Sequence, residues 1–475
     1  MPDAFAERSW MRFARSPCRT IRPCGPRRIC LSRRMLRVAS TRAMSLGWRY
    51  SGITWPPISQ ERRCLRKSFR SEVIDMSNGS GFEHSSFEHL GFEQKDILFI
   101  AANTRSLAVN RGALIRDLQE RGLSVGALVP DEDFLPEVRA LGVTTWRYHL
   151  ERHSMGLRGE IARFLELRRL IRAIAPRAVF AYSVKPIVLG IPAARLAGVS
   201  ETYCLATGLG YLYGWQDRRT RLIRAMVGLC YALSGGLSRT FFFQNPDDRD
   251  ELQQSFLFRR VTRSVVVDGS GVDPDEYPFS EPSSAPLRFL FMGRFLEEKG
   301  IREFVDAARR LAPDHPEVEF IALGDVDETT VNAIGTAEVA AWREEGHVTL
   351  PGKVRDVRGH LRAASVMVLP SYYREGIPRS LLEAMSTGRP IITCDSPGCR
   401  ETVVEGGNGW LVPPGDAEAL AERMHAFIRD PSLVGRMGRA GRALLEERFT
   451  TARVNRQMLD EMSIAQVARP LEGMA

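Results

Sequence analysis

The sequence predicts an α/β protein built from two doubly wound, Rossmann-like domains that face a central cleft. Three observations lead to this prediction. The chain has 475 residues, more than one domain usually holds. Short apolar runs alternate with amphipathic helical patterns, as in parallel sheets that helices cover on both faces. This alternation pauses at a Pro- and Ser-rich stretch, Pro278 to Leu287, and then starts again.

The first domain opens on "DILFIAAN" (Asp96 to Asn103), an apolar run typical of a buried parallel strand. "RGALIRDLQERG" follows as an amphipathic helix that ends at Gly122, and "LSVGALVP" as the second strand, which gives a βαβ unit. The alternation continues with three strands and two helices: "RAVFAYS", a helix around Ile187 to Ala197, "ETYCLATG", a helix from about Arg218 to Leu233, and "RTFFFQN".

The second domain repeats the pattern after a linker near residues 268 to 287. "RFLFMGR" is predicted as a strand, "KGIREFVDAARRLA" as a helix, and "VEFIALGD", "HVTLPG", "ASVMVLPS" and "PIITCD" as strands. We therefore expect four regions: an extension (1–94), a first domain (95–268), a second domain (269–451), and a C-terminal helix and tail (452–475) that cross back to the first domain. Ligands of such folds bind at the carboxyl ends of the strands, here in the cleft between the domains.

The first 75 residues fit neither domain. They contain 16 Arg and one Lys against five acidic residues, a net charge of +12, and no sustained hydrophobic period. Their composition allows a transit peptide. We favour translation from an upstream start, with the true start at Met76, because a polar lead-in runs from there to the first strand. In both interpretations the extension, disordered or mis-started, lies outside the core.

Charge and cysteine content exclude several classes of protein. Without those 75 residues the net charge is −3, so no nucleic-acid partner is expected. Scattered single cysteines without a CxxC pair argue against structural zinc and favour a reducing compartment. The sequence contains no uninterrupted run of ~18 apolar residues, so no transmembrane helix is expected. "GLGYLYG" (Gly208 to Gly214) misses the dinucleotide fingerprint, because its third Gly comes one place late, so NAD is not expected.

Two glutamates, Glu375 and Glu383, with seven residues between them, stand in "SYYREGIPRSLLEAMSTGRPIITCD" (Ser371 to Asp395). Glu375 precedes a predicted helix whose free N–H groups form a site for phosphate. Since a carboxylate repels phosphate, Glu375 should serve a neutral ligand part rich in hydroxyls. For Glu383, composition alone favours a solvated helix face with an i,i+4 pair to Arg379; a ligand contact is the alternative.

Two cations follow the first strand of the second domain, in "MGRFLEEKG". Arg294 comes directly after the strand and Lys299 at the start of the next helix, so both are expected near the strand ends. Together they could clamp a diphosphate, Arg294 by its fork and Lys299 as a point charge. Surface cations on a loop are the alternative.

From about Lys95 onward the chain resembles the GT-B glycosyltransferases of family 4. The resembling motifs are "GRFLEEKGIREF", "LPGKVRDV", "VLPSYYREGIPRSLLEAMSTGRPIITCD", "PGCRETVVEGGNGWLVPPGD" and the two spaced glutamates. The resemblance implies a hexosyltransferase that moves a sugar from a UDP-sugar with retention at the anomeric carbon. No cofactor is expected, since the UDP-sugar is a substrate. No metal is expected either, because "DVD" (Asp325 to Asp327) follows a different strand from the one where a metal would be needed.

The resemblance also assigns roles. Arg294 and Lys299 would hold the donor diphosphate, Glu375 the donor sugar and Glu383 the ribose hydroxyls; Glu375, Arg294 and Lys299 form the predicted catalytic set. The second domain would bind the donor and the first the acceptor. Further donor-binding positions are Gly376, Ile377 and Pro378 beside the sugar-phosphate, Gly352, Lys353 and Val354 by the base, and Gly112, which would let the diphosphate approach the first helix.

The first domain resembles bacterial enzymes that extend polyprenyl-diphosphate-linked glycans; the nearest type adds N-acetylgalactosamine to a diacetylbacillosamine carried on undecaprenyl diphosphate. Its motifs are "NRGALIRDL", "SVKPIVLGIPAARLAGV", "ATGLGYLYG", "FFFQNPDDRDEL" and "GSGVD". Expected acceptor-side residues, with local structure as the alternative for each, are Asn110, Arg111, Lys185, Thr207 and Gly208. Many family members carry His where this chain has Thr207 and Gly208, which leaves the donor sugar undefined.

These features place the expected enzyme in cell-surface polysaccharide synthesis, such as O-antigen or capsule, with a cytoplasmic location at the inner face of the membrane. "RRTRLIRAMVGLCYALSGGL" (Arg218 to Leu237) is either an interfacial helix or a buried one, and the Arg-rich segment from Arg158 to Arg172 could attract anionic lipid. Two other functions stay open on the same fold: a UDP-sugar epimerase or hydrolase, and a non-catalytic partner that binds nucleotide sugars.

Overall fold

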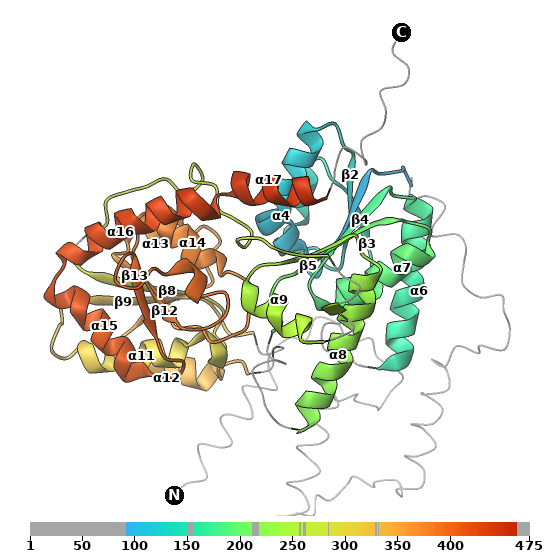
Figure 1. Ribbon diagram of the computed structural model, residues 1–475. Helices are drawn as coiled ribbons and strands as arrows, with labels where there is room; N and C mark the ends of the chain where they lie inside the picture. Colours follow the sequence, from blue (N-terminus) through green and yellow to red (C-terminus); the bar gives the residue numbers. More distant parts are fainter. Residues whose placement is uncertain are drawn as a thin grey trace, which may run out of the picture. The chain divides into compact units, whose positions relative to one another are not determined.

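The computed structural model describes residues 92–462 apart from 151–155, 211–217, 256–257, 260–262, 284, 328–329 and 331. The expected basic extension therefore lies almost entirely outside the described residues. The second half of the glycine-rich segment, Tyr211 to Gly214, lies outside them as well. Across the described part of the chain the strands form two parallel sheets, one of seven strands and one of six, and helices cover the faces of both (Figure 1).

The first sheet carries the strands of the amino-terminal half in the order β3-β2-β1-β4-β5-β6-β7. Its strands are β1 (Ile97–Ile100), β2 (Val125–Val129), β3 (Thr144–Arg147), β4 (Ala178–Tyr182), β5 (Glu201–Ala206), β6 (Thr240–Phe243) and β7 (Ser264–Val266). Its helices are α4 (Thr104–Glu120), α5 (Leu135–Ala140), α6 (Leu157–Ile174), the π-helix η2 (Pro186–Gly190), α7 (Ile191–Leu196), α8 (Arg218–Gly236) and α9 (Pro246–Gln253). The central strands β1, β2, β4 and β6 are buried at every residue, as their apolar runs predict.

The second sheet has the order β10-β9-β8-β11-β12-β13. Its strands are β8 (Arg288–Met292), β9 (Glu319–Leu323), β10 (Thr349–Gly352), β11 (Val366–Leu369), β12 (Ile391–Cys394) and β13 (Gly409–Val412). Its larger helices are α11 (Ile301–Leu311), α12 (Thr336–Glu345), α13 (Arg358–Ala363), α14 (Arg379–Ser386), α15 (Ala417–Arg429) and α16 (Ser432–Leu444). Short helical turns are η4 (Glu297–Lys299), η5 (Arg400–Thr402) and the π-turn η6 (Leu445–Phe449).

In each sheet, the direction in which the chain adds successive strands reverses at one place. Counted within its own domain, each sheet has the order 3-2-1-4-5-6 of a dinucleotide-type Rossmann sheet, and the first adds β7 at its edge. The reversal lies between β1 and β4 in the first sheet and between β8 and β11 in the second. Crevices that bind ligands open beside the carboxyl ends of the strands at this point. The predicted α/β fold with two doubly wound domains is confirmed.

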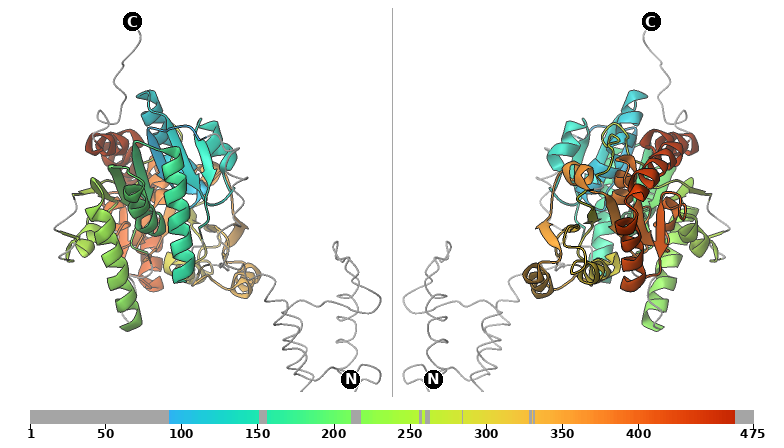
Figure 2. Two further views of the ribbon diagram at one scale, coloured as in Figure 1. Left: turned by 90° about the vertical axis from the view of Figure 1, so that its right-hand side faces the viewer. Right: turned by 90° about the vertical axis from the view of Figure 1, so that its left-hand side faces the viewer.

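The last helix, α17 (Thr451–Glu461), belongs to the core of the first domain although it follows the second in sequence. Val454, Met458, Leu459 and Met462 are buried in one apolar cluster with strand residues of the first sheet. The Asn455 amide donates to the Asp117 carboxylate on α4 at 2.8 Å. Figures 1 and 2 show α17 lying against this domain, beside α4.

The helix α4 begins earlier than its apolar pattern predicted. We expected a helix from Arg111, but it starts at Thr104, because the Asn103 side chain accepts a hydrogen bond from the Ser106 N–H at 2.7 Å and caps the free backbone. The extra turns bring Arg105 and Ser106 to the carboxyl end of β1, at the crevice of the first sheet.

Candidate functional site

The first part of the site lies at the carboxyl ends of β8 and β11. The turn η4 follows β8, and the loop Ser371 to Ile377 follows β11, so the neighbouring strands bring the two segments together. Gly300 ends η4 with φ +76°, and a Cβ there would collide with the Pro370 carbonyl oxygen. A glycine at this position therefore lets η4 dock closely against the loop after β11.

Lys299 and Glu375 form an ion pair in this place. The Lys299 ammonium donates to Glu375 Oε1, and the side chains are only 10% and 20% exposed. The Ser371 hydroxyl donates to the same oxygen at 3.2 Å, and the ammonium lies 5.7 Å from the centroid of the Tyr373 ring. Two residues that were predicted for separate parts of a ligand thus form one charged, largely buried unit.

Arg294 is placed differently from Lys299. Its side chain is exposed, and it makes no ion pair with the described residues. An exposed guanidinium next to the end of β8 keeps its donors available to a ligand. Of the expected clamp, Lys299 is therefore held by an ion pair, whereas Arg294 is exposed and makes no ion pair with the described residues.

Glu383 corrects one expectation from the sequence. Its side chain is not on a solvated face: the residue is 8% exposed on α14. The predicted pair is present, with Arg379 Nε donating to Oε1 at 2.9 Å, and the Tyr277 hydroxyl donates to the same oxygen at 3.1 Å. Burial raises the pKa of Glu383 above its usual value, while Arg379 and Tyr277 oppose the rise. Across the described ranges, both hydrogen bonds fall on Oε1, so Oε2 can receive a ligand.

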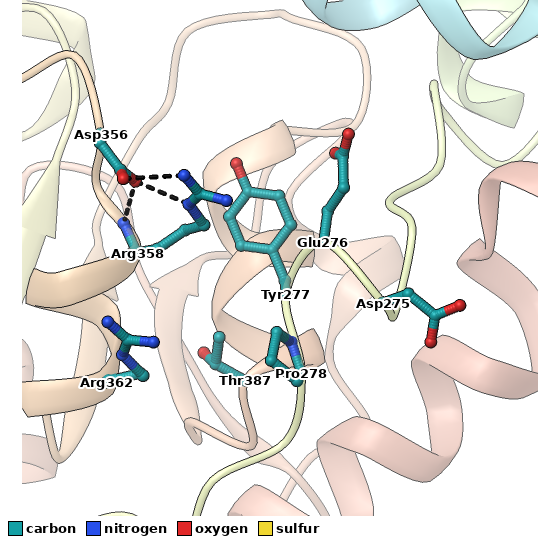
Figure 3. Close-up of a pocket in the computed structure, with 8 residues that line it drawn as sticks. All are labelled: Asp275, Glu276, Tyr277, Pro278, Asp356, Arg358, Arg362 and Thr387. Atoms are coloured by element: carbon teal, nitrogen blue, oxygen red, sulfur yellow. Dashed lines mark hydrogen bonds and ion pairs between the residues drawn. The ribbon is translucent and has the colours of Figure 1, made fainter.

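A cavity of about 350 Å³ lies beside Tyr277, whose hydroxyl donates to Glu383 (Figure 3). It is lined by Asp275, Glu276, Tyr277, Pro278, Asp356, Arg358, Arg362 and Thr387. Arg358 pairs with Asp356 at 2.8 Å, and the Tyr277 ring spans from this cavity to the Glu383 carboxylate. The Tyr277 side chain therefore lines the cavity and also contacts the Glu383 carboxylate.

The predicted base loop, Gly352 to Val354, ends β10 beside a contact between the domains. Gly352 has φ +89°, Lys353 is exposed and Val354 packs on the core of the second domain. Next to them, the Arg355 guanidinium lies 5.6 Å from the centroid of the Phe134 ring, which also has Arg105 at 5.6 Å. Phe134 has φ +61°, an outlier for a bulky residue. At this end of the site, the Phe134 ring thus contacts one arginine from each domain.

The first domain covers the loop after β11 by backbone pairing. The Gly376 N–H donates to the Thr207 carbonyl at 3.0 Å, and the Gly210 N–H donates to the Arg374 carbonyl at 2.8 Å. Gly208 lies between them with φ +111°, and a Cβ there would come within 2.5 Å of Glu375 Cα. The N–H of Gly376, a residue expected beside the sugar-phosphate, is therefore used in this pairing.

Side chains of α9 strengthen this contact. The Asn245 amide donates to the Glu375 carbonyl at 3.3 Å, and Arg374 lies 3.4 Å from the Asp248 carboxylate. Burial raises the pKa of Asp248 to about 6, against the opposing effect of Arg374. The loop that carries Glu375 is thus held on one side by its own domain and on the other by β5 and α9.

The predicted acceptor residues do not form one cluster. Thr207 shares a hydrogen bond with Ser183 at 2.9 Å and lies at the site, together with Gly208. Lys185 instead donates to Glu160 on α6 at 2.9 Å. Asn110 is half-buried on α4, and Arg111 is almost fully buried.

A Cβ at Gly112 would meet its neighbours only at ordinary van der Waals distance, so packing among the described residues does not itself require a glycine there. The nearest atom to a Cβ at this buried position would be Leu141 Cδ1, at 3.4 Å, where α4 meets the end of α5. The close approach of the donor diphosphate expected at Gly112 therefore stays a prediction.

Several residues at the site were not predicted as functional. They are Arg105, Phe134, Asn245, Asp248, Tyr277, Arg374 and Arg379. Arg379 carried a signal, its i,i+4 spacing from Glu383, but we took the pair as solvated. Tyr277 and Phe134 carried none, because each reaches the site from a loop distant in sequence.

The chain matches two family models and many relatives. The model described as "Glycosyl transferase 4-like" matches residues 96–240 and that of "Glycosyl transferases group 1" matches 286–430, together more than half of the chain. The N,N'-diacetylbacillosaminyl-diphospho-undecaprenol alpha-1,3-N-acetylgalactosaminyltransferase of Campylobacter jejuni is 25% identical over 68% of this chain and 86% of its own length. The putative colanic acid biosynthesis glycosyltransferase WcaL of Escherichia coli is 30% identical over 41% of this chain and only half of its own length.

Solved structures agree with the fold. HepE of Anabaena, solved in complex with UDP and glucose, superposes with a TM-score of 0.63 and 17% identity over 77% of this chain and 99% of its own. The sucrose-phosphate synthase of Thermosynechococcus elongatus superposes with a TM-score of 0.63 and 18% identity over 78% and 99%. The resemblance stated from the sequence motifs is confirmed. The chain belongs to the GT-B glycosyltransferases, with a glycosyl transferase 4-like domain ahead of a glycosyl transferases group 1 domain.

Proposed function

We propose that this glycosyltransferase moves a sugar, an N-acetylhexosamine or hexose, from a UDP-sugar to a saccharide carried on a polyprenyl diphosphate. The observation that carries the proposal is the largely buried Lys299–Glu375 pair at the switch point of the second sheet, on the loop that leads into the helix of Glu383. It combines a cation for phosphate with carboxylates for hydroxyls. The relative from Campylobacter acts on an undecaprenyl-diphosphate-linked saccharide, and HepE binds UDP, which supports both substrates.

The residues divide the work of transfer. Lys299 and the exposed Arg294 stabilise charge on the diphosphate as it leaves. Glu375 accepts hydrogen bonds from the donor sugar, and Glu383 Oε2 accepts them from the ribose. The bond from the anomeric carbon to the phosphate oxygen breaks, and the bond to the acceptor oxygen forms on the same face. The configuration is retained because the new bond forms on the face that the diphosphate leaves, and the acceptor proton passes to an oxygen of the leaving diphosphate.

A transfer assay tests the proposal. The purified chain is incubated with lipid-linked acceptors and labelled UDP-GalNAc, UDP-GlcNAc, UDP-galactose or UDP-glucose. Label should move to the lipid fraction from at least one donor, with the anomeric configuration kept, and EDTA should leave the rate unchanged. Hydrolysis or epimerisation of the donor without transfer would point to the alternative enzymes instead. Binding without any turnover would point to a non-catalytic partner.

The proposal includes peripheral contact with the inner face of an anionic membrane. The α6–α8 ridge consists of the apolar side chains Ile161, Leu165, Met226, Leu229, Leu233 and Leu237, which are 37% to 59% exposed. Both helices pack against η2, and Figure 2 (left) shows them on the same side of the domain. Exposed arginines on α6 (Arg158, Arg169 and Arg172) flank the apolar positions, a combination that suits an anionic lipid surface.

The exposed apolar residues of α8 lie on one face of the helix. In the portion of the chain that is described, no helix has both the length and the apolar character that crossing a bilayer requires. The α8 stripe recurs at 226, 229, 233 and 237, which puts its members on one exposed face. We therefore propose that α8 lies along the interface, so that a lipid-linked acceptor can reach the first domain.

Substitution of the ridge should separate membrane binding from chemistry. We expect Met226→Ser, Leu229→Ser and Leu233→Ser together to lower binding to vesicles of phosphatidylcholine and phosphatidylglycerol by about tenfold or more, because apolar area no longer leaves water. Co-sedimentation measures this, and added salt should weaken the wild-type binding. Val404→Ser, at an exposed apolar position of the second domain, is the control. Equal binding by the triple variant, or a loss of self-association in its place, would contradict the proposal.

A further inference from the structure

One buried cation is left without a counter-charge by the described residues. Arg111 is 1% exposed on α4, and its Nε and Nη1 atoms are buried without a hydrogen-bond partner there. Its Nη2 group donates to the Ser270 hydroxyl at 3.3 Å. The guanidinium lies 5.8 Å from the centroid of the Tyr182 ring, which is neutral. None of these contacts supplies a negative charge.

The electrostatic surroundings make this arrangement costly. Burial lowers the pKa of Arg111 to about 10, Tyr182 offsets part of the effect, and the Arg379 guanidinium adds to it. No carboxylate is among the neighbours that hold the charge. Buried guanidinium groups are almost always paired with an anion, and more than nine in ten buried polar groups have partners. The unpaired Nε and Nη1 groups of Arg111, beside a second arginine, therefore favour the binding of an anion from outside the chain.

The position of Arg111 connects it to the loop after β11. Ser270, which accepts from Arg111, also accepts from the Gln244 amide at 3.2 Å. Gln244 in turn packs so closely on Gly376 that a Cβ there would overlap its side-chain oxygen. Gly269, next to Ser270, leaves no room for a Cβ against Ile377, 2.9 Å away. Arg111 thus reaches, through one layer of side chains, the segment that precedes α14.

That segment favours phosphate. α14 is eight residues long, and the free N–H groups of its first turn face the loop after β11. Arg379, in its first turn, donates to the Gly271 carbonyl at 3.1 Å and so points toward the same hinge segment as Arg111. A guanidinium fork matches two phosphate oxygens, so the unpaired donors of Arg111 near a helix start suit a phosphate group, with the charge of Arg379 close by.

We propose that Arg111 is a phosphate-binding residue, supplied by the first domain, for one of the two diphosphates that the reaction brings together. The inference rests on the proposed function and deepens it. Its Nε and Nη1 groups bind oxygens of the donor diphosphate or of the lipid acceptor diphosphate, and Arg379 flanks the same anion. Because protein atoms now cover these groups, binding requires the side chains that cover Arg111 to move aside.

The central experiment uses Arg111→Met in the full chain. Methionine fills the space without a charge, and replacing an unpaired buried charge by an apolar side chain is neutral or stabilising. We expect the Tm of the unliganded variant to stay the same or rise. We expect the affinity for inorganic pyrophosphate to fall by about 10- to 100-fold, because hydrogen bonds between charged groups are lost. A purely structural arginine would give the opposite result, a lower Tm with unchanged affinity.

Two further ligands identify the source of the phosphate. A loss of affinity for UDP with normal binding of farnesyl diphosphate assigns Arg111 to the donor, and the reverse assigns it to the acceptor. Arg111→Lys, which keeps the charge but not the fork, should lose part of the affinity and serves if the methionine variant does not fold. Arg116→Met, at an exposed arginine of the same helix, should bind all three ligands like the wild type.

The outcomes separate this inference from the function on which it rests. If the wild-type chain bound neither UDP nor farnesyl diphosphate, the proposed function would fail and Arg111 with it. If the wild type bound and transferred normally, and both Arg111 variants bound every diphosphate equally well, the inference alone would be overturned.

Discussion

Replacing Gly208 with alanine is expected to reduce sugar transfer by about 100-fold or more while each domain stays folded. Gly208 has φ +111°, which an L-residue rarely adopts, and the new Cβ would meet Glu375 Cα at 2.5 Å. Both the positive φ and the clash with Glu375 Cα involve backbone that cannot change rotamer. The loop of Gly208 and the loop of Glu375 must therefore separate. That separation breaks the pairing of Thr207 with Gly376 and moves Glu375, and displacements of about 1 Å at a reacting centre can cost 10²-fold in rate.

Gly198 offers a matched control in the same domain. It has φ +99°, but a Cβ there would meet nothing within 4 Å. Gly198→Ala therefore imposes the same backbone strain, about 1–2 kcal/mol, without a collision. We expect a lower Tm and normal transfer kinetics for Gly198→Ala. Normal kinetics in Gly208→Ala as well would show that transfer does not need the close contact between Gly208 and Glu375.

The two glutamates should respond differently when each is replaced by glutamine. We expect Glu375→Gln to lower kcat by about 10²-fold, because the variant no longer balances Lys299 or orients the donor sugar in the transition state. Its affinity for UDP, measured by calorimetry, should be unchanged or higher, since Lys299 is released toward the diphosphate. For Glu383→Gln we expect affinity for UDP to fall by about tenfold or more, through the weaker hydrogen bonds of an uncharged acceptor.

This pair of variants tests the division of roles directly. Loss of UDP binding in Glu375→Gln, with normal turnover of the donor that still binds, would reverse our assignment. Arg379→Lys helps to separate direct from indirect effects at Glu383, because it keeps a cation but alters the 2.9 Å contact to Oε1. A Tm measured for each variant identifies any loss of affinity that comes from unfolding.

Local patterns predicted most of the architecture. Fully apolar runs such as "TFFF" and "VMVL" are buried parallel strands because both faces of the sheet are covered. The positions of Lys299 and Glu375 followed from the ends of β8 and β11, since neighbouring parallel strands finish at one edge. This part of the site depends on short distances along the chain and on the order of the strands.

The remaining parts depend on partners distant in sequence. Glu383 looked solvated because its helix face is polar, but Tyr277, from a segment more than 100 residues earlier, covers it. The beginning of α4 was missed because Asn103 was counted with the preceding strand and not as a cap. The burial of Arg111 against Ser270 joins elements 159 residues apart, and no periodicity encodes such a contact.

The placement of α17 has a consequence for biosynthesis. The first domain leaves the ribosome well before the second, yet one face of its sheet is completed by Val454, Met458 and Met462. At about 5–20 residues per second, the roughly 190 residues that follow β7 take on the order of 10–40 s to make. During that interval the apolar surface of the first domain that α17 later covers is exposed to solvent. Nascent chains should therefore depend on a holding chaperone, and a nonsense codon near residue 450 should destabilise the domain made first.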